Sequence, residues 1–409
     1  MLRQSPRVVT VETPVSHDTE AQDRAFTWLL TGREGYGVIQ TIINLSNSLR
    51  QRGLPVQIYT IGQGRGLEQI RQTQLPIRCL NIEEPLRFQG NLLQRGYAVA
   101  FNNYRRRSQV AQLRKAIGIE TPRTIHCTAP HLIGLVGAAA RHYKAIPLWE
   151  VTQVTGVNDR LGLGRRIYGR LCRKFRIVVL PNSHATAATL DLRAIRSVVN
   201  YACVDADRFD PSVVRSIGRK ELTIDNDRVV ATIVARLEPL KGQAMVLQAV
   251  KSINQMGYGM TLLLVGGPIE SEFVDRLRSI AKSDPKMLHI VGPVNRPERY
   301  YGVTDFAISA YKGQEGFGLS VVEAMLMRRP ALVHSLGGPG ETVLDGVTGW
   351  HVSKATTESF VEGIRRALLD RSRWIEMGEA ARQRASENFG CQVTADRYLR
   401  TIYQEEDDR

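Results

Sequence analysis

Short apolar segments alternate with amphipathic segments along almost the whole chain. The apolar segments are RVVTVET, PVQIYTI, RTIHCTA, AIPLWEVT and RIVVLPNS in the first half, and RVVATIVARL, MTLLLVGG, MLHIVGP, DFAISAY and PALVHSL in the second half. Each is short and rich in apolar or β-branched residues, as strands are, and helical patterns separate several of them. Apolar strands that alternate with helices are typical of parallel sheets covered on both faces. Two such runs predict an α/β protein with two doubly wound, Rossmann-like domains that face a cleft.

The two runs also set the predicted domain boundaries. Turn-forming and charged residues interrupt the alternation between Val204 and Asp225, so we expect a first domain over residues 1–205 and a second over residues 206–378. The remaining residues, 379–409, have a helical pattern. A chain of 409 residues exceeds the usual size of one domain, which agrees with this division. Ligands of such sheets bind beyond the carboxyl ends of the strands, so we expect the site between the halves.

The composition is that of a soluble globular protein. The apolar fraction is 43% and the charged fraction 23%, both of which are ordinary values. No apolar run approaches the roughly 18 residues that a membrane span needs. The N-terminus lacks a basic-then-apolar signal pattern, so we expect a cytoplasmic protein. The five cysteines are scattered without CxxC spacing and predict neither disulfides nor a zinc site.

Basic residues outnumber acidic ones by 55 to 40, which gives a net charge of +15. In a dense basic cluster at residues 160–176, Leu163, Ile167, Leu171 and Phe175 recur every four residues, while arginines and a lysine fill the other faces. This spacing predicts a basic amphipathic helix. Such a helix either packs on a sheet through its apolar stripe or is attracted to an anionic membrane surface. Nucleic acid is disfavoured as a partner, because aromatic residues are only 7% of the chain and no binding module is recognisable.

A glycine-flanked aromatic residue precedes an apolar helical pattern in the second half. In EGFGLSVVEAM, residues 315–325, Gly316 and Gly318 bracket Phe317, and the helical pattern begins at Leu319. The glycines allow a strand-to-helix turn and the close approach of a ligand. The unpaired amides and partial positive charge of the first helical turn suit a phosphate group. We therefore expect this turn, from Gly316 to Leu319, to bind the phosphates of a donor.

Two carboxylates flank the turn. Glu315 precedes it and Glu323 lies eight positions later, a separation of roughly 12 Å if one helix contained both. We therefore expect Glu315 outside the helix. Acids on both sides of a phosphate site suggest that hydroxyl groups are recognised there, and a nucleotide sugar has that layout.

Four motifs follow one another in the second half. They are VARLEPLKG, LLLVGGP, EGFGLSVVEAM and GGPGETVLDGVTGWHV. In order and spacing they resemble the second domain of family 4 of the retaining glycosyltransferases, which have the GT-B architecture. The likeness continues more weakly through YGVIQTIINLSNSLRQRG, TIHCTAPHLIGLVGAAAR and VDADRFDPS, and so spans almost the full chain. It implies that the final helical segment, residues 379–409, crosses back to brace the first domain.

The resemblance implies roles for four residues. In the family the first acid of the EGFG stretch contacts the donor sugar and the second binds the ribose hydroxyls, and these positions are Glu315 and Glu323 here. Arg236 and Lys241 match the basic pair of the family's RLxxxKG motif. Physical reasoning agrees, because an arginine and a lysine on a loop after an apolar strand can neutralise the diphosphate as it leaves. Glu315, Arg236 and Lys241 are the predicted catalytic residues, and Glu323 is predicted to bind the donor.

The first domain offers weaker candidates. Gly37 aligns with the second glycine of the family's glycine pair, where bare backbone approaches the diphosphate, whereas Tyr36 replaces the first glycine and makes the loop bulkier. His126 fits the family's histidine-containing segment and is either a sugar or acceptor contact or a core histidine. Where the family has a second histidine the chain has Gln153, whose amide could still hydrogen-bond a sugar oxygen.

We expect no metal ion and no other cofactor. The two DxD strings, at residues 205–207 and 225–227, could hold a divalent ion, but both fall between the predicted domains and the basic pair already supplies countercharge. Gly337, Gly338 and Glu341 match the family's GGxxE stretch, although a tight turn with a helix-starting acid explains them nearly as well.

These observations lead to one hypothesis for function. The chain would be a nucleotide-sugar-dependent hexosyltransferase that transfers a sugar to an acceptor hydroxyl with retention of configuration, in bacterial cell-surface glycan or glycolipid synthesis. The acceptor, a glycan or a lipid-linked molecule, would lie against the first domain, shaped by a loop over residues 14–33. The enzyme would be cytoplasmic and peripheral on the inner face of the membrane.

Three alternatives are open. A nucleotide-sugar epimerase would share the architecture, but the EGFG stretch and the RLxxxKG pair favour transfer. A non-catalytic membrane-binding protein would explain the charge and leave the acids without a role. A dehydrogenase is disfavoured because no GxGxxG follows a strand.

Overall fold

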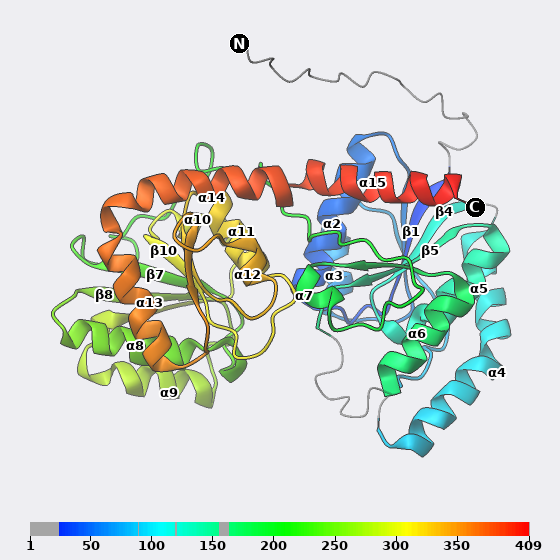
Figure 1. Ribbon diagram of the computed structural model, residues 1–409, viewed down its shortest axis with the longest axis horizontal. Coiled ribbons are helices and arrows are strands. Elements are labelled where there is room, and N and C mark those ends of the chain that lie inside the picture. Colours follow the sequence, from blue (N-terminus) through cyan, green and yellow to red (C-terminus); the bar gives the residue numbers. More distant parts are fainter. Residues whose placement is uncertain (1–23, 89, 119–120, 155–162, 409) are drawn as a thin grey trace, which may run out of the picture.

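The computed structural model describes residues 24–88, 90–118, 121–154 and 163–408. These residues form two α/β domains that lie side by side, with long helices running along one edge of both (Figure 1). The first sheet contains strands β1 Ala25–Leu30, β2 Val56–Thr60, β3 Ile77–Cys79, β4 Pro122–Cys127, β5 Ile146–Val151 and β6 Val178–Pro181. The second contains β7 Val229–Val234, β8 Met260–Val265, β9 Leu288–Gly292, β10 Phe306–Ser309, β11 Ala331–His334 and β12 Gly349–Val352.

Every strand pairing within the two sheets is parallel, and the two sheets have the same topology. The strand orders are β3-β2-β1-β4-β5-β6 and β12-β11-β10-β7-β8-β9. The direction of winding therefore reverses between β1 and β4 in the first sheet and between β7 and β10 in the second. Ligands of open α/β sheets bind beyond the carboxyl ends of the strands at such reversals.

Helices cover both faces of each sheet. Those of the first domain are α2 Tyr36–Gln51, α3 Arg65–Arg71, α4 Leu92–Ile117, α5 Ile133–Tyr143, α6 Leu163–Phe175 and α7 His184–Ala187. The second domain has α8 Gln243–Gln255, α9 Glu272–Ile280, α10 Glu298–Tyr301, α11 Leu319–Leu326, α12 Pro339–Thr342, α13 Thr357–Leu369 and α14 Trp374–Phe389, and α15 Cys391–Asp407 follows. Short 3-10 turns occupy Pro130–Leu132, Pro239–Lys241, Ala281–Ser283, Pro285–Met287 and Arg371–Arg373.

The chain passes between the domains twice, at neighbouring places. Val204 forms a bridge with Gly390, and its amide donates to the carbonyl of Phe389 at 3.0 Å. Before this point α14 packs on the second domain, and after it Tyr398 and its neighbours in α15 are buried in the core of the first. The last helix thus packs on the first domain, and the crossing lies at Gly390.

The fold class is confirmed, and the predicted strands appear close to their expected bounds, with one exception. RVVTVET lies outside the described residues. The pattern missed β1, β3 and β12. Of these, β1, AFTWLL, occupies part of the span where we expected a pocket-shaping loop. That expectation is wrong for residues 25–30, because all six are buried at the centre of the sheet. A strand buried on both faces lacks alternation, so periodicity does not distinguish it from other apolar runs.

Candidate active site

Lys241 and Glu315 meet where the winding of the second sheet reverses. Lys241 ends the 3-10 turn after β7, and its Nζ lies 2.9 Å from Glu315 Oε1. Ser309, the last residue of β10, donates its hydroxyl to Glu315 Oε2 at 3.1 Å. Tyr311 places its ring 4.8 Å below the ammonium group. Both side chains of the pair keep about a fifth of their surface exposed, 23% for the lysine and 20% for the glutamate, so a ligand can reach them.

Helix α11 begins at Leu319, four residues beyond Glu315, as the glycines predicted. Gly318 adopts φ +88°, and the amides of Val321 and Val322 bond back to its carbonyl. The amides of Leu319 and Ser320 have no acceptor among the described residues. They are therefore available to a phosphate, with the helix dipole in their favour.

Arg236 lies at the same strand end but is not joined to Glu315. Its guanidinium pairs with Glu238 at 3.1 Å and is 75% exposed. Its carbonyl accepts a hydrogen bond from buried Gln243 at 2.7 Å, which fixes the loop. The structure thus brings Lys241 to Glu315 and leaves Arg236 exposed and paired with Glu238.

Glu323 lies on the buried side of α11. Tyr301 donates its hydroxyl to Glu323 Oε2 at 3.3 Å and to the carbonyl of Ser320 at 2.9 Å. Burial raises the pKa of Glu323 to about 7, and the positive charge of Arg208 opposes the shift. Arg208 itself is held by the buried carboxylate of Glu298 at 3.1 Å. The predicted ribose contact is therefore a carboxylate that is partly protonated at neutral pH.

The first domain approaches this helix through α2. A Cβ on Gly37 would lie 2.9 Å from Leu319 Cδ1, so bare backbone faces the start of α11. Burial raises the pKa of Tyr36 above its ordinary value. The positive charge and the hydrogen bond of Arg208 oppose this shift, and the negative charge of Glu323 adds to it. Tyr36 therefore reaches the surroundings of Glu323 from the other domain.

A second polar cluster lies at the carboxyl ends of β1 and β4. Glu34 accepts bonds at Oε1 from the amide and hydroxyl of Thr31, at 2.7 and 2.8 Å, while its Oε2 is buried without a partner. His131 Nε2 lies 2.8 Å from Glu84 Oε1, and burial lowers the pKa of the imidazole. The sequence analysis did not single out these residues, because no motif links positions so far apart. They lie on the side where we expect the acceptor.

His126 and Gln153 have different surroundings. His126 is fully buried and lies 2.6 Å from Glu150, 2.9 Å from Thr124 and 2.8 Å from the hydroxyl of Tyr398. The structure therefore agrees with a core histidine, and a sugar or acceptor contact does not fit. Gln153 is exposed just beyond β5, so the amide can still reach a ligand.

The GGxxE stretch packs directly on the loop that carries Glu315. The amide of Gly338 donates to the carbonyl of Glu315 at 2.9 Å, and a Cβ on Gly337 would lie 2.2 Å from that oxygen. Glu341 reaches across to the first domain, where the amides of His184 and Ala185 donate to its carboxylate. The stretch is thus part of the site's framework.

The first acid of each DxD string has partners within the protein. Asp205 accepts bonds from the amides of Asp207 and Arg208, and Asp225 pairs with Lys286 at 2.9 Å. Among the described residues no group of three or more histidine, cysteine or acidic side chains could hold a metal ion.

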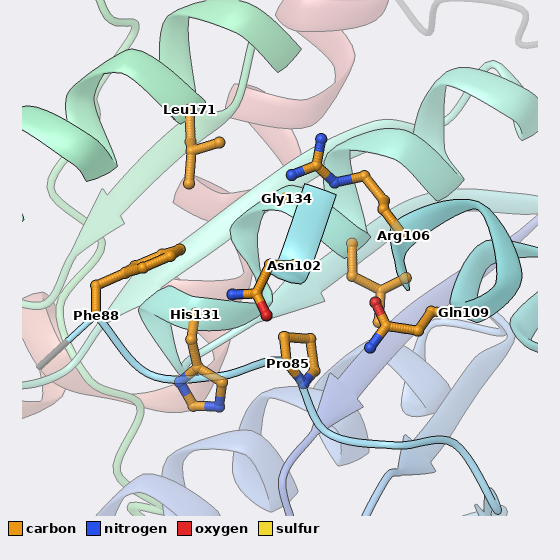
Figure 2. A pocket seen from close by; sticks show the side chains of 9 residues that line it. Pro85, Phe88, Asn102, Arg106, Gln109, His131, Gly134 and Leu171 are labelled. Carbon is orange, nitrogen blue, oxygen red and sulfur yellow. The ribbon is translucent and has the colours of Figure 1, made fainter. Parts of the chain in front are cut away.

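A small pocket in the first domain includes His131 of the second polar cluster. Figure 2 shows residues that line it, among them Arg106 of α4, Leu171 of α6 and His131 of the 3-10 turn Pro130–Leu132. It contains none of the residues predicted for the donor.

Comparison with known proteins agrees with the second-domain motifs. Residues 214–384 match the family model of the glycosyl transferases group 1. The lipopolysaccharide 1,2-N-acetylglucosaminetransferase of Salmonella typhimurium is 28% identical over 219 residues, which cover 51% of this chain and 56% of that protein. The D-inositol 3-phosphate glycosyltransferase of Rhodococcus erythropolis is 31% identical over 204 residues, covering 48% of this chain and 45% of that protein. The chain spans about half the length of the curated relatives it matches.

Solved structures share the complete fold. The Anabaena protein Alr3699/HepE in complex with UDP superimposes with a TM-score of 0.75 at 18% identity, covering 93% of this chain and 100% of that one. A glycosyltransferase from Rickettsia africae gives a TM-score of 0.74 at 18% identity, covering 93% of this chain and 98% of that one. The two domains of this chain therefore have the GT-B arrangement.

Proposed function

We propose that the protein is a retaining, metal-independent glycosyltransferase that moves a hexosyl group from a nucleotide diphosphate sugar to an acceptor hydroxyl. The observation that carries the proposal is the contact of Lys241 Nζ with Glu315 Oε1 at 2.9 Å, beside the amides that open α11. A cation, helix amides and a carboxylate at one point match the diphosphate and the sugar hydroxyls of such a donor. The group 1 match over residues 214–384 supports the same reaction.

The residues of the second domain would divide the donor between them. Glu323 holds the ribose hydroxyls, the amides of Leu319 and Ser320 bind the diphosphate, and Glu315 binds hydroxyls of the sugar. Lys241 then exchanges part of its contact with Glu315 for a phosphate oxygen, and Arg236 leaves Glu238 for the same diphosphate. Neutralisation of the departing phosphate is the main electrostatic contribution, because its negative charge grows as the bond to the sugar breaks.

Attack would take place on the face that the leaving group departs from. The bond between C1 and the diphosphate oxygen breaks while the acceptor oxygen bonds to C1 on the same side, and the proton of the acceptor hydroxyl passes to the departing phosphate. Glu315, the carboxylate that pairs with Lys241, is assigned to sugar binding and not to nucleophilic attack. Because attack on this face retains the configuration in one step, no protein nucleophile is needed on the opposite face.

The acceptor would lie against the first domain, near the cluster of Glu34, Glu84 and His131. Glycan and glycolipid acceptors are the named substrates of several relatives, including the phosphatidylinositol monomannoside mannosyltransferase of Mycolicibacterium smegmatis. A lipid-linked or growing surface glycan is the class that we propose here, with the enzyme docked on the inner face of an anionic membrane. Among the described residues no helix is both long and apolar enough to cross a bilayer.

A thermal-shift screen of nucleotide sugars, followed by transfer assays with the donor found, tests the proposal. A ligand that binds only the folded protein raises its melting temperature. We expect Glu323→Ala to weaken UDP binding and Glu315→Gln to keep UDP binding while transfer falls. NMR of the product should show the anomeric configuration of the donor. A screen in which no nucleotide or nucleotide sugar shifts the melting temperature contradicts the proposal.

An epimerase of the same architecture makes a different prediction. Incubation with donor alone would convert it to an isomer without any acceptor. The transferase leaves the sugar configuration of the donor unchanged under these conditions.

A further inference from the structure

The carboxylate of Glu341 is bound by the opposite domain. Glu341 lies in α12 of the second domain, and its Oε1 accepts a bond from the amide of Ala185 at 2.6 Å. Its Oε2 accepts bonds from the amide of His184 at 2.9 Å and from the hydroxyl of Tyr201 at 3.3 Å. His184 and Ala185 open α7, which follows β6 of the first domain and lies near the junction of the two domains (Figure 1). Three donors on one carboxylate are a charge-assisted contact between the domains.

The same short helix also holds the loop that carries Glu315. Gln314 donates its side-chain amide to the carbonyl of Ala185 at 3.2 Å, and Thr186 Oγ1, which donates to Asn182 at 2.8 Å, lies 3.5 Å from the carbonyl oxygen of Gly316. The residues immediately before and after Glu315 therefore both contact α7.

The other side of this loop is fixed within the second domain. Gly338, three residues before Glu341, donates its amide to the carbonyl of Glu315 at 2.9 Å. The loop thus lies between α7 of the first domain and the segment that leads into α12. Glu341 joins these two supports, because its backbone belongs to one and its carboxylate binds the other.

We propose that Glu341 is a positioning residue that couples closure of the two domains to the placement of Glu315. This inference rests on the proposed function of Glu315 as the sugar contact. When the domains separate, the bonds of Glu341 to α7 break, and Gln314 and Gly316 lose their partners at the same time. The carboxylate of Glu315 then keeps Lys241 and Ser309, and its carbonyl keeps the bond from Gly338, but the residues on either side of it have lost their partners in the first domain. Because the acceptor binds the first domain, the sugar is held for transfer only when that domain is in place.

The test is Glu341→Gln, measured with UDP, the identified donor and its acceptor. Glutamine has the same size, but its NH2 group must face an amide N–H of α7, so at least one bond is lost. We expect kcat to fall by about tenfold or more, since small misplacements of a reacting group can cost up to about 100-fold. The KM for the donor and the Kd for UDP should stay within about twofold of the wild-type values, because the second domain makes those contacts.

Two variants serve as controls. Tyr201→Phe removes one donor and keeps both backbone bonds, so its kcat should lie close to that of the wild type. Glu379→Gln changes an exposed acid of α14 that pairs with Arg328 at 3.2 Å, and it should have no effect. If kcat of Glu341→Gln is unchanged, or if the Kd for UDP rises in step with the loss of kcat, the inference is overturned.

Closure can be measured without activity. Small-angle scattering should give a larger radius of gyration for Glu341→Gln than for the wild type and Glu379→Gln, and an unchanged radius overturns the closure step. If Glu341→Gln does not fold, Gln314→Ala breaks the contact from the other end and should give the same split between kcat and KM. Failure of the proposed function itself would appear differently, as a wild-type protein that binds no nucleotide.

Discussion

At the scale of single residues, Glu323 has a charge state near neutral pH that depends on the fold. Its carboxyl keeps its proton up to about pH 7 in the folded protein, against an ordinary pKa of 4.5, because burial disfavours the carboxylate. Between these two values the folded state holds more protons than the unfolded state. The free energy of unfolding therefore falls as the pH rises through this window.

We predict that Glu323→Gln removes this dependence. Glutamine resembles the protonated acid, so the variant should match the wild type below pH 4.5 and be more stable than it above pH 7. The difference should be on the order of 3 kcal/mol at most, since one pKa unit corresponds to about 1.4 kcal/mol. Urea unfolding across this pH range provides the measurement. If the free energy of unfolding changes with pH in the same way in both proteins, the pKa of Glu323 is not raised by the fold.

The sequence predicts the residues that sit within recognisable motifs and misses those brought in from elsewhere. Glu315 and the start of α11 lie in one motif and Lys241 in another, and the two motifs follow strands that are neighbours in one sheet. Arg208 reaches Glu323 from a turn more than a hundred positions earlier, and no periodicity links the two. The sequence alone does not distinguish a core histidine from a histidine in a binding site. For His126 the distinction comes from its burial in the structure.

At the scale of elements, the packing of the GGxxE stretch on the Glu315 loop depends on the absence of a side chain at Gly337. This residue has φ +105°, and a Cβ there would lie 2.2 Å from the carbonyl oxygen of Glu315. Gly346 has φ +74° but no atom within 4 Å of such a Cβ. A side chain would strain the backbone at both positions but would clash with another atom only at Gly337, so comparing the two substitutions distinguishes strain from steric contact.

We predict that Gly337→Ala lowers both stability and transfer, whereas Gly346→Ala lowers stability alone. The left-handed conformation should cost either variant about 1–2 kcal/mol, and the clash adds about 1–3 kcal/mol for Gly337→Ala. Because relief of the clash moves the backbone of Glu315, kcat should also fall. Chemical denaturation and kinetics of both variants check this. Equal losses in the two would exclude a steric role for the Glu315 contact.

Two helices of the first domain present groups suited to a membrane surface. Helix α6 forms as predicted, with Cys172 and Phe175 buried and Arg166 and Arg170 exposed. The start of α4 exposes a stripe that the sequence analysis did not identify, with Leu93 84% and Tyr97 63% exposed. Aromatic and aliphatic side chains beside arginines are typical of helices that lie in the headgroup region.

We predict that the protein floats with phosphatidylglycerol-containing vesicles at low salt and not with phosphatidylcholine vesicles. Arg166→Glu with Arg170→Glu should weaken binding by about 30-fold or more, given about 1 kcal/mol for each basic residue near the surface. Leu93→Ser with Tyr97→Ser should weaken binding at every salt concentration, because apolar burial is not screened. A lack of association of the wild type at low salt would contradict membrane docking.

At the scale of the whole molecule, the repeated apolar pattern is enough to predict two doubly wound domains, because both sheets have the same strand topology. Ten segments were expected as strands, and the described ones became β2 and β4 to β11. The short edge strands β3 and β12 were missed because three or four residues carry too little pattern. The relation between the domains depends on single contacts, such as Gly37 with Leu319, that no sequence pattern encodes.

The crossing helix α15 is joined to β4 of the first domain by a buried hydrogen-bond network. This network should stabilise the fold without affecting donor binding. The hydroxyl of Tyr398 lies 2.8 Å from His126 Nε2, which also has Thr124 at 2.9 Å. Tyr398→Phe should therefore cost only about 1 kcal/mol, whereas Tyr398→Ala, which leaves a cavity, should cost about 3–5 kcal/mol. The Kd for UDP, measured by calorimetry where each variant is folded, should stay at the wild-type value because the donor residues lie in the other domain. Weaker UDP binding by Tyr398→Phe would mean that His126 influences the donor site, since this variant keeps the packing and removes only the hydroxyl.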